Sequence, residues 1–423
     1  MAANRIAWLA LSSAAILAAQ INPDRQMLAN ALIAGDLHIV QDLLSSGVDP
    51  NLPDRYGQSA LSVAILYRNA KAVDMLLARH ADPNAPLRRN DRRSMVPLQI
   101  AAREADARIA KALLSAGARI DDKAGTGQTP LHYAVQGDRL DMIRFLLNKG
   151  ADVNVRDSEG ASPLDDAIWR KSLEGVAILV AHGANLSDPD PQTGATPLNE
   201  AAYRGDARIV SFLLRFHPDV TIPDKKGYAP FANALRMKNE ACALALLDAE
   251  PKEPLTPAFF GNAMEMAAAR DEAQVLDALI QRGVAVNSPL PSGRTALNVA
   301  ASSGSAAAAA SLLNHHADPN VASPGGAMPL EDATLKGFGS IVSMLLDHGA
   351  RIDQINSDSG ATALYAAASF GRGEAVNLLL DHGANPSLCG TNRRTPLEAA
   401  TANGYSEAAD AIRKHGGQEH CSQ

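Results

Sequence analysis

Aromatic residues are scarce in this chain. They make up 4% of its 423 residues, although 46% of the residues are hydrophobic. A low aromatic content at a normal hydrophobic content favours thin, regular layers filled by Ala, Leu, Ile and Val. Basic residues are not in excess either, because the net charge is −7 and the pI about 5.9. This charge excludes a broad electrostatic attraction to nucleic acid or to anionic membranes.

The common catalytic motifs are also absent from the sequence. It contains no Gly-rich phosphate loop ending in Gly-Lys-Ser/Thr, no His-Glu-x-x-His and no Gly-x-Ser-x-Gly. Most of the histidines recur at the end of a predicted helix, where the helix dipole favours them. They stand just before the Gly that ends the helix or in that Gly position itself: His182, His348, His382 and His415, and His80, His217 and His316. We therefore expect no enzymatic activity, no metal site and no cofactor.

Cysteine is limited to three residues, Cys242, Cys389 and Cys421. So small and odd a number does not indicate a disulfide framework. Cys242 lies in an apolar helical stretch and is predicted to fill the core. Cys389 lies in a late loop, and the tail with Cys421 should pass near it, so these two residues are a candidate disulfide in an oxidising compartment.

The chain has one uncharged apolar run, at residues 6–19, between Arg5 and the polar chain that begins at Gln20. A positive residue, a short apolar stretch and a small-residue end are typical of a secretory signal peptide. The run is too short to span a bilayer. We predict a signal peptide over 1–19 on a periplasmic or secreted bacterial protein, without stable membrane insertion after cleavage. The alternative is an additional N-terminal helix on a cytoplasmic protein.

What the chain does have is repetition. A phrase close to Thr-Pro-Leu returns every 33 or 34 residues, with a single step of 37. A fixed period of this size predicts a stack of small units, not a globular domain with one cleft. Its Leu position, called the anchor below, is occupied by Leu28, Leu61, Leu98, Leu131, Leu164, Leu198, Phe231, Met264, Leu297, Leu330, Leu364 and Leu397.

Residues 127–160 illustrate one unit. Thr129 is suited to cap a helix, and Pro130 to occupy its first position, where the missing N–H costs nothing. A second apolar helix follows and ends at Gly150, a residue that tolerates the left-handed cap conformation. A loop then projects until Gly160. Each unit is therefore predicted to be helix, turn, helix and loop, with apolar faces that only stacking covers.

In these features the chain resembles the ankyrin repeat family. The resemblance rests on Thr-Pro-Leu, on Ala-Ala three and four residues after the anchor, on Gly seven residues after it, and on Gly-Ala-Asp-Val-Asn at 150–154. It covers about residues 25–417. The resemblance implies an all-α ankyrin-repeat solenoid of about twelve helix-turn-helix units with projecting β-hairpin-like loops. It also implies protein binding on the concave face that the loop tips and first helices form.

The seventh unit interrupts the pattern, because three prolines in residues 251–257 cannot continue a helix. We therefore divide the chain at this point and expect a soft joint there. The predicted parts are a signal peptide at 1–19, repeats 1–7 at 20–248, an irregular Pro-rich joint at 249–261, repeats 8–12 at 262–417, and a tail at 418–423.

Binding residues are expected five and six positions after each anchor, where the first helix should be exposed. Aromatic residues in these positions are Tyr67, Trp169, Tyr203 and Phe370, and Arg170 and Arg204 stand beside two of them. Exposed aromatic residues next to Arg have the composition of interface hot spots. The alternative is that the rings cover gaps between neighbouring repeats.

A second candidate is the loop that makes the 37-residue step. It carries Arg88, Arg89, Arg92 and Arg93 on an otherwise acidic chain. Such a basic loop suits an acidic protein surface or a phosphate group. The alternative is a solvated loop without a partner.

The sequence therefore predicts a monomeric, non-enzymatic, exported scaffold or regulator that binds one or more proteins and no nucleic acid. Two alternatives keep the fold: an intracellular adaptor or host-delivered effector, and a self-assembling structural stack.

Overall fold

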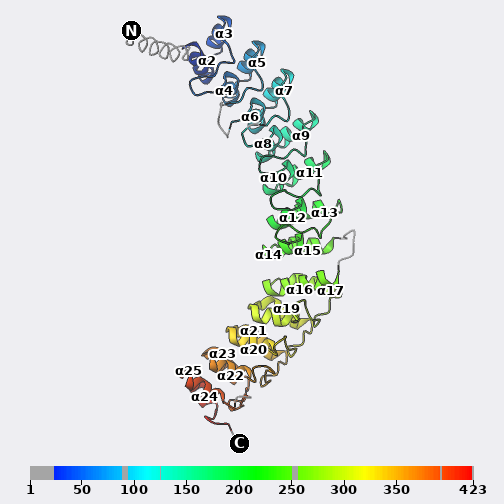
Figure 1. The fold of residues 1–423 in the computed structure, drawn as a ribbon, viewed down its shortest axis with the longest axis vertical. Helices are drawn as coiled ribbons and strands as arrows, with labels where there is room; N and C mark the ends of the chain where they lie inside the picture. Colours follow the sequence, from blue (N-terminus) through cyan, green and yellow to red (C-terminus); the bar gives the residue numbers. More distant parts are fainter. Residues whose placement is uncertain (1–22, 88–93, 124, 250–255, 391–392, 422–423) are drawn as a thin grey trace, which may run out of the picture. The chain divides into compact units, whose positions relative to one another are not determined.

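The computed structural model describes residues 23–87, 94–123, 125–249, 256–390 and 393–421. Within these ranges the regular elements are α-helices, which follow one another as twelve pairs (Figure 1). The projecting loops contain no strand in the same ranges. The all-α repeat prediction is confirmed, and the predicted signal peptide and the arginines of residues 88–93 lie outside the described residues.

The first helices of the pairs are α2 (Pro23–Ala34), α4 (Ala60–Leu66), α6 (Pro97–Glu104), α8 (Pro130–Gln136), α10 (Pro163–Trp169), α12 (Pro197–Arg204), α14 (Pro230–Arg236), α16 (Pro257–Arg270), α18 (Ala296–Ser303), α20 (Pro329–Lys336), α22 (Ala363–Ser369) and α24 (Pro396–Ala402). The second helices are α3 (Leu37–Ser45), α5 (Ala70–Ala78), α7 (Ala107–Ser115), α9 (Leu140–Asn148), α11 (Leu173–Ala181), α13 (Ala207–Leu214), α15 (Glu240–Asp248), α17 (Ala273–Gln281), α19 (Ala306–Asn314), α21 (Gly339–Asp347), α23 (Gly373–Asp381) and α25 (Ser406–Lys414).

The chain forms two compact units, residues 1–200 and 201–423. In each unit, first helices pack on first helices and second helices on second helices, as α6 does on α8 and α19 on α21. The boundary falls within α12, earlier in the chain than the Pro-rich stretch at 249–261. No described helix is both long and apolar enough to cross a membrane.

The anchor residues form the core of each layer. All twelve are buried, and so are the alanine pairs that follow several of them, such as Ala201 with Ala202 and Ala300 with Ala301. Small side chains allow neighbouring helices to approach closely, which is why a stack this thin needs few aromatic residues. The period in the sequence therefore identified the buried positions correctly.

In several repeats the residue after the anchor links the start of the first helix to the next repeat. The backbone N–H of Thr129 donates to Nδ1 of His132 at 3.1 Å, and Nε2 of His132 lies 3.1 Å from the carbonyl of Ala161. A carbonyl only accepts, so Nε2 carries the proton and the ring is neutral. Burial lowers the pKa of His132, which is consistent with this form. Gln99 and Asn298 bridge in the same way.

A second polar link uses the Asn of the Gly-Ala-Asp-Val-Asn phrase. Asn154 Nδ2 donates to the carbonyl of Gly183 at 3.2 Å, and its Oδ1 accepts the N–H of Asn185 at 2.9 Å. One side chain thereby satisfies both backbone groups at the end of the next repeat's second helix. Four other asparagines make the same pair of bonds: Asn51, Asn84, Asn287 and Asn320.

The histidines near the ends of second helices are structural, as predicted. In four repeats Nδ1 lies 2.8–3.0 Å from the carbonyl four residues earlier, so the ring donates to a helix end that lacks a partner. These residues are His182, His348, His382 and His415. His80, His217 and His316 have positive φ, as the Gly position requires.

The seventh repeat departs from the pattern, and one expectation about it was wrong. Helix α15 ends at Asp248, and Ala249 is extended, as the prolines predict. Residues 257–261 were expected to be irregular but form the start of α16, which is fourteen residues long. The reason is local: Thr256 accepts the N–H of Phe259, and Pro257 occupies the first helical position, where it favours a helix.

Near the C-terminus, Cys389 and Cys421 form a disulfide, with their Cα atoms 5.9 Å apart. Cys242 is buried in α15, as expected of a core residue. The disulfide ties the tail to the loop that precedes α24.

The residue seven positions after every anchor, where the first helix ends, has a positive φ and the left-handed backbone conformation. Glycine meets this demand in six repeats without a steric penalty. The six glycines are Gly35, Gly205, Gly304, Gly337, Gly371 and Gly404, and the other six residues are Arg68, Ala105, Asp138, Lys171, Lys238 and Asp271. Half of the repeats therefore keep a strained residue in a position that favours Gly.

Replacing a strained residue by glycine should stabilise the stack. Ala105 has φ of 61°, so we expect Ala105→Gly to raise the free energy of unfolding by about 0.5–1 kcal/mol in urea titrations. Ala116 also follows a helix but has φ of −89°, so Ala116→Gly should lower stability slightly. Equal effects of the two changes would show that strain at Ala105 is not what limits stability.

Candidate protein-binding surface

Three of the predicted aromatic residues are well exposed at the ends of first helices. The exposed fractions are 54% for Tyr67, 58% for Trp169 and 61% for Phe370. Tyr67 and Trp169 belong to the first unit and are separated by two intervening repeats, and Phe370 belongs to the second unit. Arg170, which caps α10 directly after Trp169, is exposed as well. These three positions are exposed, as the sequence predicted.

Trp169 borders a recess of about 130 Å³ in the first unit. Residues of the loops that precede α10 and α12, and of these two helices, line the recess. Four carboxyl groups and the small residues Ala161 and Ala195 line it, and the carboxyl groups are those of Glu159, Asp165, Asp190 and Glu200. An indole beside several carboxylates is a favourable environment for a cationic side chain.

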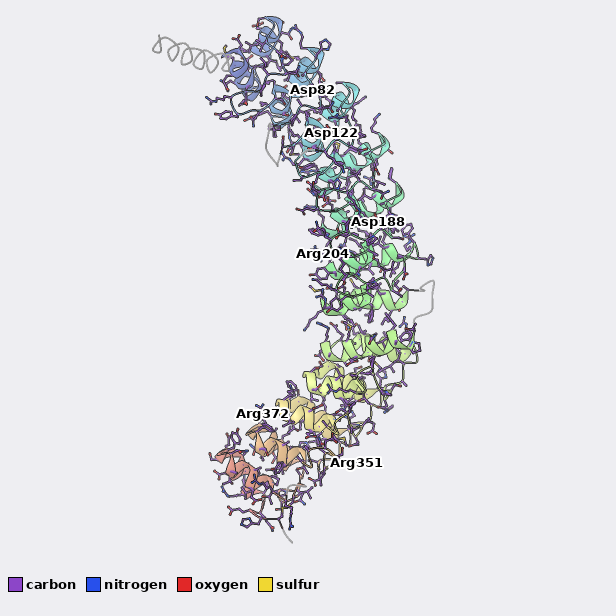
Figure 2. The ribbon with its side chains drawn as sticks, in the orientation of Figure 1. Asp82, Asp122, Asp188, Arg204, Arg351 and Arg372 are labelled. Atoms are coloured by element: carbon purple, nitrogen blue, oxygen red, sulfur yellow. A yellow bond between two sulfur atoms is a disulfide. The ribbon has the colours of Figure 1, made fainter. Side chains whose placement is uncertain are left out.

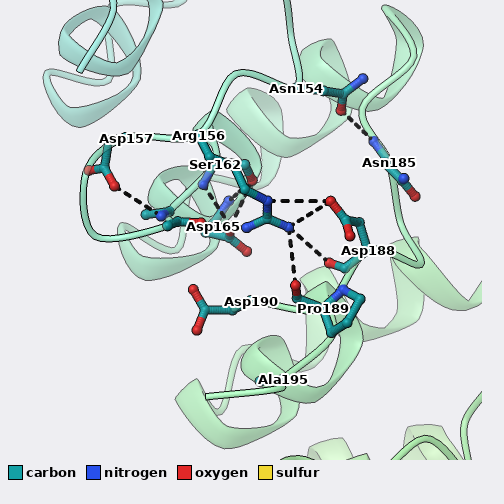
Figure 3. A network of polar contacts seen from close by, with 12 residues as sticks. Asn154, Arg156, Asp157, Ser162, Asp165, Asn185, Asp188, Pro189, Asp190 and Ala195 are labelled. Atoms are coloured by element: carbon teal, nitrogen blue, oxygen red, sulfur yellow. Dashed lines mark hydrogen bonds and ion pairs between the residues drawn. The ribbon is translucent and has the colours of Figure 1, made fainter. Parts of the chain in front are cut away.

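A polar network fixes the walls of this recess (Figure 3). Arg156 reaches from one loop to the next, where its guanidinium donates to Asp188 Oδ2 at 2.8 Å and forms an ion pair with Asp165 at 3.7 Å. Asp165 also accepts the backbone N–H and hydroxyl of Ser162 at 2.8 and 2.7 Å. Asp190 accepts the N–H of Thr193 at 2.6 Å, which holds its own loop closed. The recess is therefore held in shape by the loops themselves.

In the second unit, Tyr203 is half-buried, and so it is less exposed than the sequence predicted. Two guanidinium groups cover its ring: Arg236 lies 5.6 Å and Arg204 5.8 Å from the ring centre (Figure 2 labels Arg204). Arg236 also lies 4.6 Å from the ring of Tyr228. The side chains thus form a stacked group of aromatic rings and arginines, which is a composition typical of interfaces.

Sequence reasoning missed Arg236 and Tyr228. Arg236 stands five positions after the anchor Phe231, so the rule that selected Trp169 and Tyr203 also applies to it. Tyr228 precedes its helix in a loop, and only the fold brings its ring under Arg236. The arginines of residues 88–93 lie outside the described residues, so their role stays a prediction.

Comparison with protein families agrees with this geometry. A model of ankyrin repeats in three copies matches residues 8–87, 27–124, 98–190, 264–356 and 330–423, and a single ankyrin repeat matches 193–225. The chain belongs to the ankyrin repeat family. These matches leave out residues 226–263, which contain α14, α15 and the start of α16, so the ankyrin pattern is weakest where the seventh repeat is irregular.

Ankyrin-repeat relatives match over short stretches. The bovine (Bos taurus) cyclin-dependent kinase 4 inhibitor B is 38% identical over 98 residues, which cover 22% of this chain and 69% of the relative. The mouse (Mus musculus) RelA-associated inhibitor is 36% identical over 102 residues, which cover 24% of this chain and 12% of the relative. Among solved structures, the ankyrin repeat domain of Bcl-3 has 26% sequence identity, covers 49% of this chain and 93% of that chain, and gives a TM-score of 0.45.

Two neighbouring carboxyl groups of this ankyrin surface have raised pKa values. Burial raises the pKa of Asp165, and it raises the pKa of Asp166 to about 7, against a hydrogen bond from Gln136. Gln136 Nε2 lies 3.1 and 3.2 Å from the two carboxylate oxygens of Asp166. The folded chain therefore favours the protonated form of Asp166, and ionising it costs stability.

Removing the charge of Asp166 should stabilise the first unit near neutral pH. The folded pKa lies above the unfolded one, so the unfolded state holds fewer protons between about pH 4 and 7, and stability falls as pH rises through this window. We expect Asp166→Asn to raise the free energy of urea unfolding by about 1 kcal/mol or more at pH 7.5 and by much less at pH 4. A benefit that is independent of pH would contradict this assignment.

Proposed function

We propose that this ankyrin-repeat chain is a non-enzymatic scaffold or regulator that binds a protein through its first helices and loop tips. The observation that carries the proposal is the exposed Trp169 beside a recess lined by carboxyl groups in the first unit. A large indole exposed to water on a helix is typical of an interaction site, and aromatic residues are enriched in binding hot spots.

The second unit offers a different chemistry for the same purpose. Arg204, Tyr203, Arg236 and Tyr228 present stacked cations and rings, while Trp169 stands among acids. Surfaces of opposite sign favour one complementary partner over general charge attraction. Two of the relatives are named inhibitors, which agrees with a regulatory role achieved by binding.

We also propose that the protein acts after export. The charged residue and apolar run at 5–19 have the pattern of a signal peptide. The disulfide between Cys389 and Cys421 supports this proposal, because such bonds persist in oxidising compartments.

Substitution of Trp169 and Tyr203 should abolish partner capture. We expect a tagged full-length chain to recover a protein from cell-envelope extract by cross-linking and mass spectrometry, and Trp169→Ala with Tyr203→Ala to lose it. The unfolding midpoint should change little for Trp169→Ala, because the ring is 58% exposed. The matched control is Phe216→Ala, an exposed ring beyond the end of α13 and off the first-helix surface.

Two results would count against the surface. Capture that survives both substitutions would place the partner elsewhere, and a large loss of stability would show that the rings are packing residues. Recovery of a multimer of the chain itself would instead support the self-assembling alternative.

The proposed export can be tested on its own. The protein isolated from its natural source should begin near Gln20, and after denaturation without reductant one thiol, that of Cys242, should react with a thiol reagent. Edman sequencing and mass spectrometry measure both. A retained N-terminal segment together with three reactive thiols would favour the intracellular adaptor.

A further inference from the structure

The disulfide near the C-terminus occupies two positions that carry an ion pair in an earlier pair of repeats. Cys389 stands 25 residues after its anchor, and Cys421 stands 24 residues after the next anchor. In the fourth and fifth repeats the same positions hold Arg156 and Asp188. There the guanidinium donates to the carboxylate at 2.8 Å and joins the two loops (Figure 3). A covalent bond between successive loops thus takes the place of an ion pair.

Other links hold the residues that follow α25, but they are weak. We call residues 416–421 the capping segment. Ser387 Oγ of the preceding loop accepts a backbone N–H of this segment at 3.1 Å and donates to one of its carbonyls at 3.5 Å. Nδ1 of His420 lies 3.6 Å from Oε1 of Glu398 in α24, and the His420 side chain is 87% exposed. Exposed pairs of this kind contribute little to stability, so the disulfide is the strongest link of the segment.

The last helix pair also has little apolar packing of its own. Helix α25 buries Ile412 and two alanines, whereas α23 in the preceding pair buries Val376, Leu379 and Leu380 together with an alanine. Since stabilisation scales with the apolar area removed from water, α25 is held less firmly than α23. It is the last helix of the described residues, so within them no further pair stacks on it. A link across the loops therefore matters more here than in the middle of the stack.

We propose that the Cys389–Cys421 bond is a redox-controlled lock on the last helix pair. When closed, it holds the capping segment on the preceding loop and limits the opening of α24 and α25. When open, it leaves the segment attached by exposed polar contacts alone, and the pair opens locally more often. The two cysteines are 32 residues apart, and a cross-link over such a distance strongly restricts the opened chain. The lock acts whichever protein binds the first helices.

A dithiol can operate this lock because the bond is accessible. Cys389 and Cys421 are half-buried, whereas the thiol of Cys242 is buried. A thiolate of dithiothreitol attacks one Sγ, which breaks the Sγ–Sγ bond, and the second thiol of the reagent then releases the mixed disulfide. Two electrons and two protons pass to the cysteines, and the reagent becomes a cyclic disulfide. Because cytosolic thiols keep such bonds open, the pair is locked only in an oxidising compartment.

The test follows amide hydrogen exchange of the full chain by mass spectrometry, before and after treatment with dithiothreitol. We expect peptides from α24 and α25 to exchange at least about tenfold faster after reduction. Peptides from α18 and α19 should not change, because each pair in a stack contacts only its neighbours. Unchanged exchange in α25 overturns the proposal. An equal increase throughout the second unit also overturns it, because the bond would then stabilise the whole unit and not lock its end.

Three variants assign the effect to the bond. Cys389→Ser with Cys421→Ser should exchange like the reduced chain and show no response to dithiothreitol. Cys389→Arg with Cys421→Asp copies the pair of Arg156 and Asp188, so it should slow exchange in α25 relative to the serine variant, again without a response. The control is Cys242→Ala, which should keep the full response. All three should remain folded by circular dichroism.

The variants also allow the proposal to fail. If the serine variant still responds to dithiothreitol, or if Cys242→Ala abolishes the response, the reductant acts elsewhere and the lock is refuted. If the serine variant exchanges as slowly as the oxidised chain, the capping segment stays docked without the bond, which refutes it equally. Neither result depends on partner capture at Trp169, which belongs to the first unit.

Discussion

Every layer of this structure depends on the repeat beside it. A single helix pair has too few apolar residues to cover its own anchor and alanines. These residues become buried only when another pair stacks on the apolar face. Small residues such as Ala201 and Ala202 let that stacking be close. The backbone N–H and C=O groups at the helix ends also need hydrogen-bond partners, and the neighbouring repeat supplies them. Asn154 does so by bonding to Gly183 and Asn185 of the next repeat. Apolar packing and hydrogen bonding thus both stabilise the interface between neighbouring repeats.

The surface chemistry follows from this arrangement. Because the interior of each layer is uniform, variation is free to occur where first helices end and loops turn. Trp169 stands at such an end, and the loop network of Arg156, Asp165 and Asp188 holds the acidic walls beside it. In the second unit the same positions carry Tyr203, Arg204 and Arg236, which stack on one another. A repeated scaffold therefore displays chemically distinct surfaces without a change of fold.

The seventh repeat differs from the others in the residues that connect it to the next repeat. It lacks the closing Gly phrase, and Ala232 stands in the position where Gln99, His132 and Asn298 bond to the next loop. A groove lies between α14 and α16, and residues 226–263 fall outside the matched family ranges.

The sequence alone determined the fold class, the twelve units and their buried anchors, because these depend on a local period and on caps such as Thr129-Pro130 that act within one turn of chain. It also identified the structural histidines, since a helix end is a local environment. Only the tertiary structure decided that Arg236 covers Tyr203, that α16 faces Ala232, and that burial raises the pKa of Asp166 to about 7. These features depend on distances between residues about thirty positions apart, which side-chain packing sets and spacing along the chain does not.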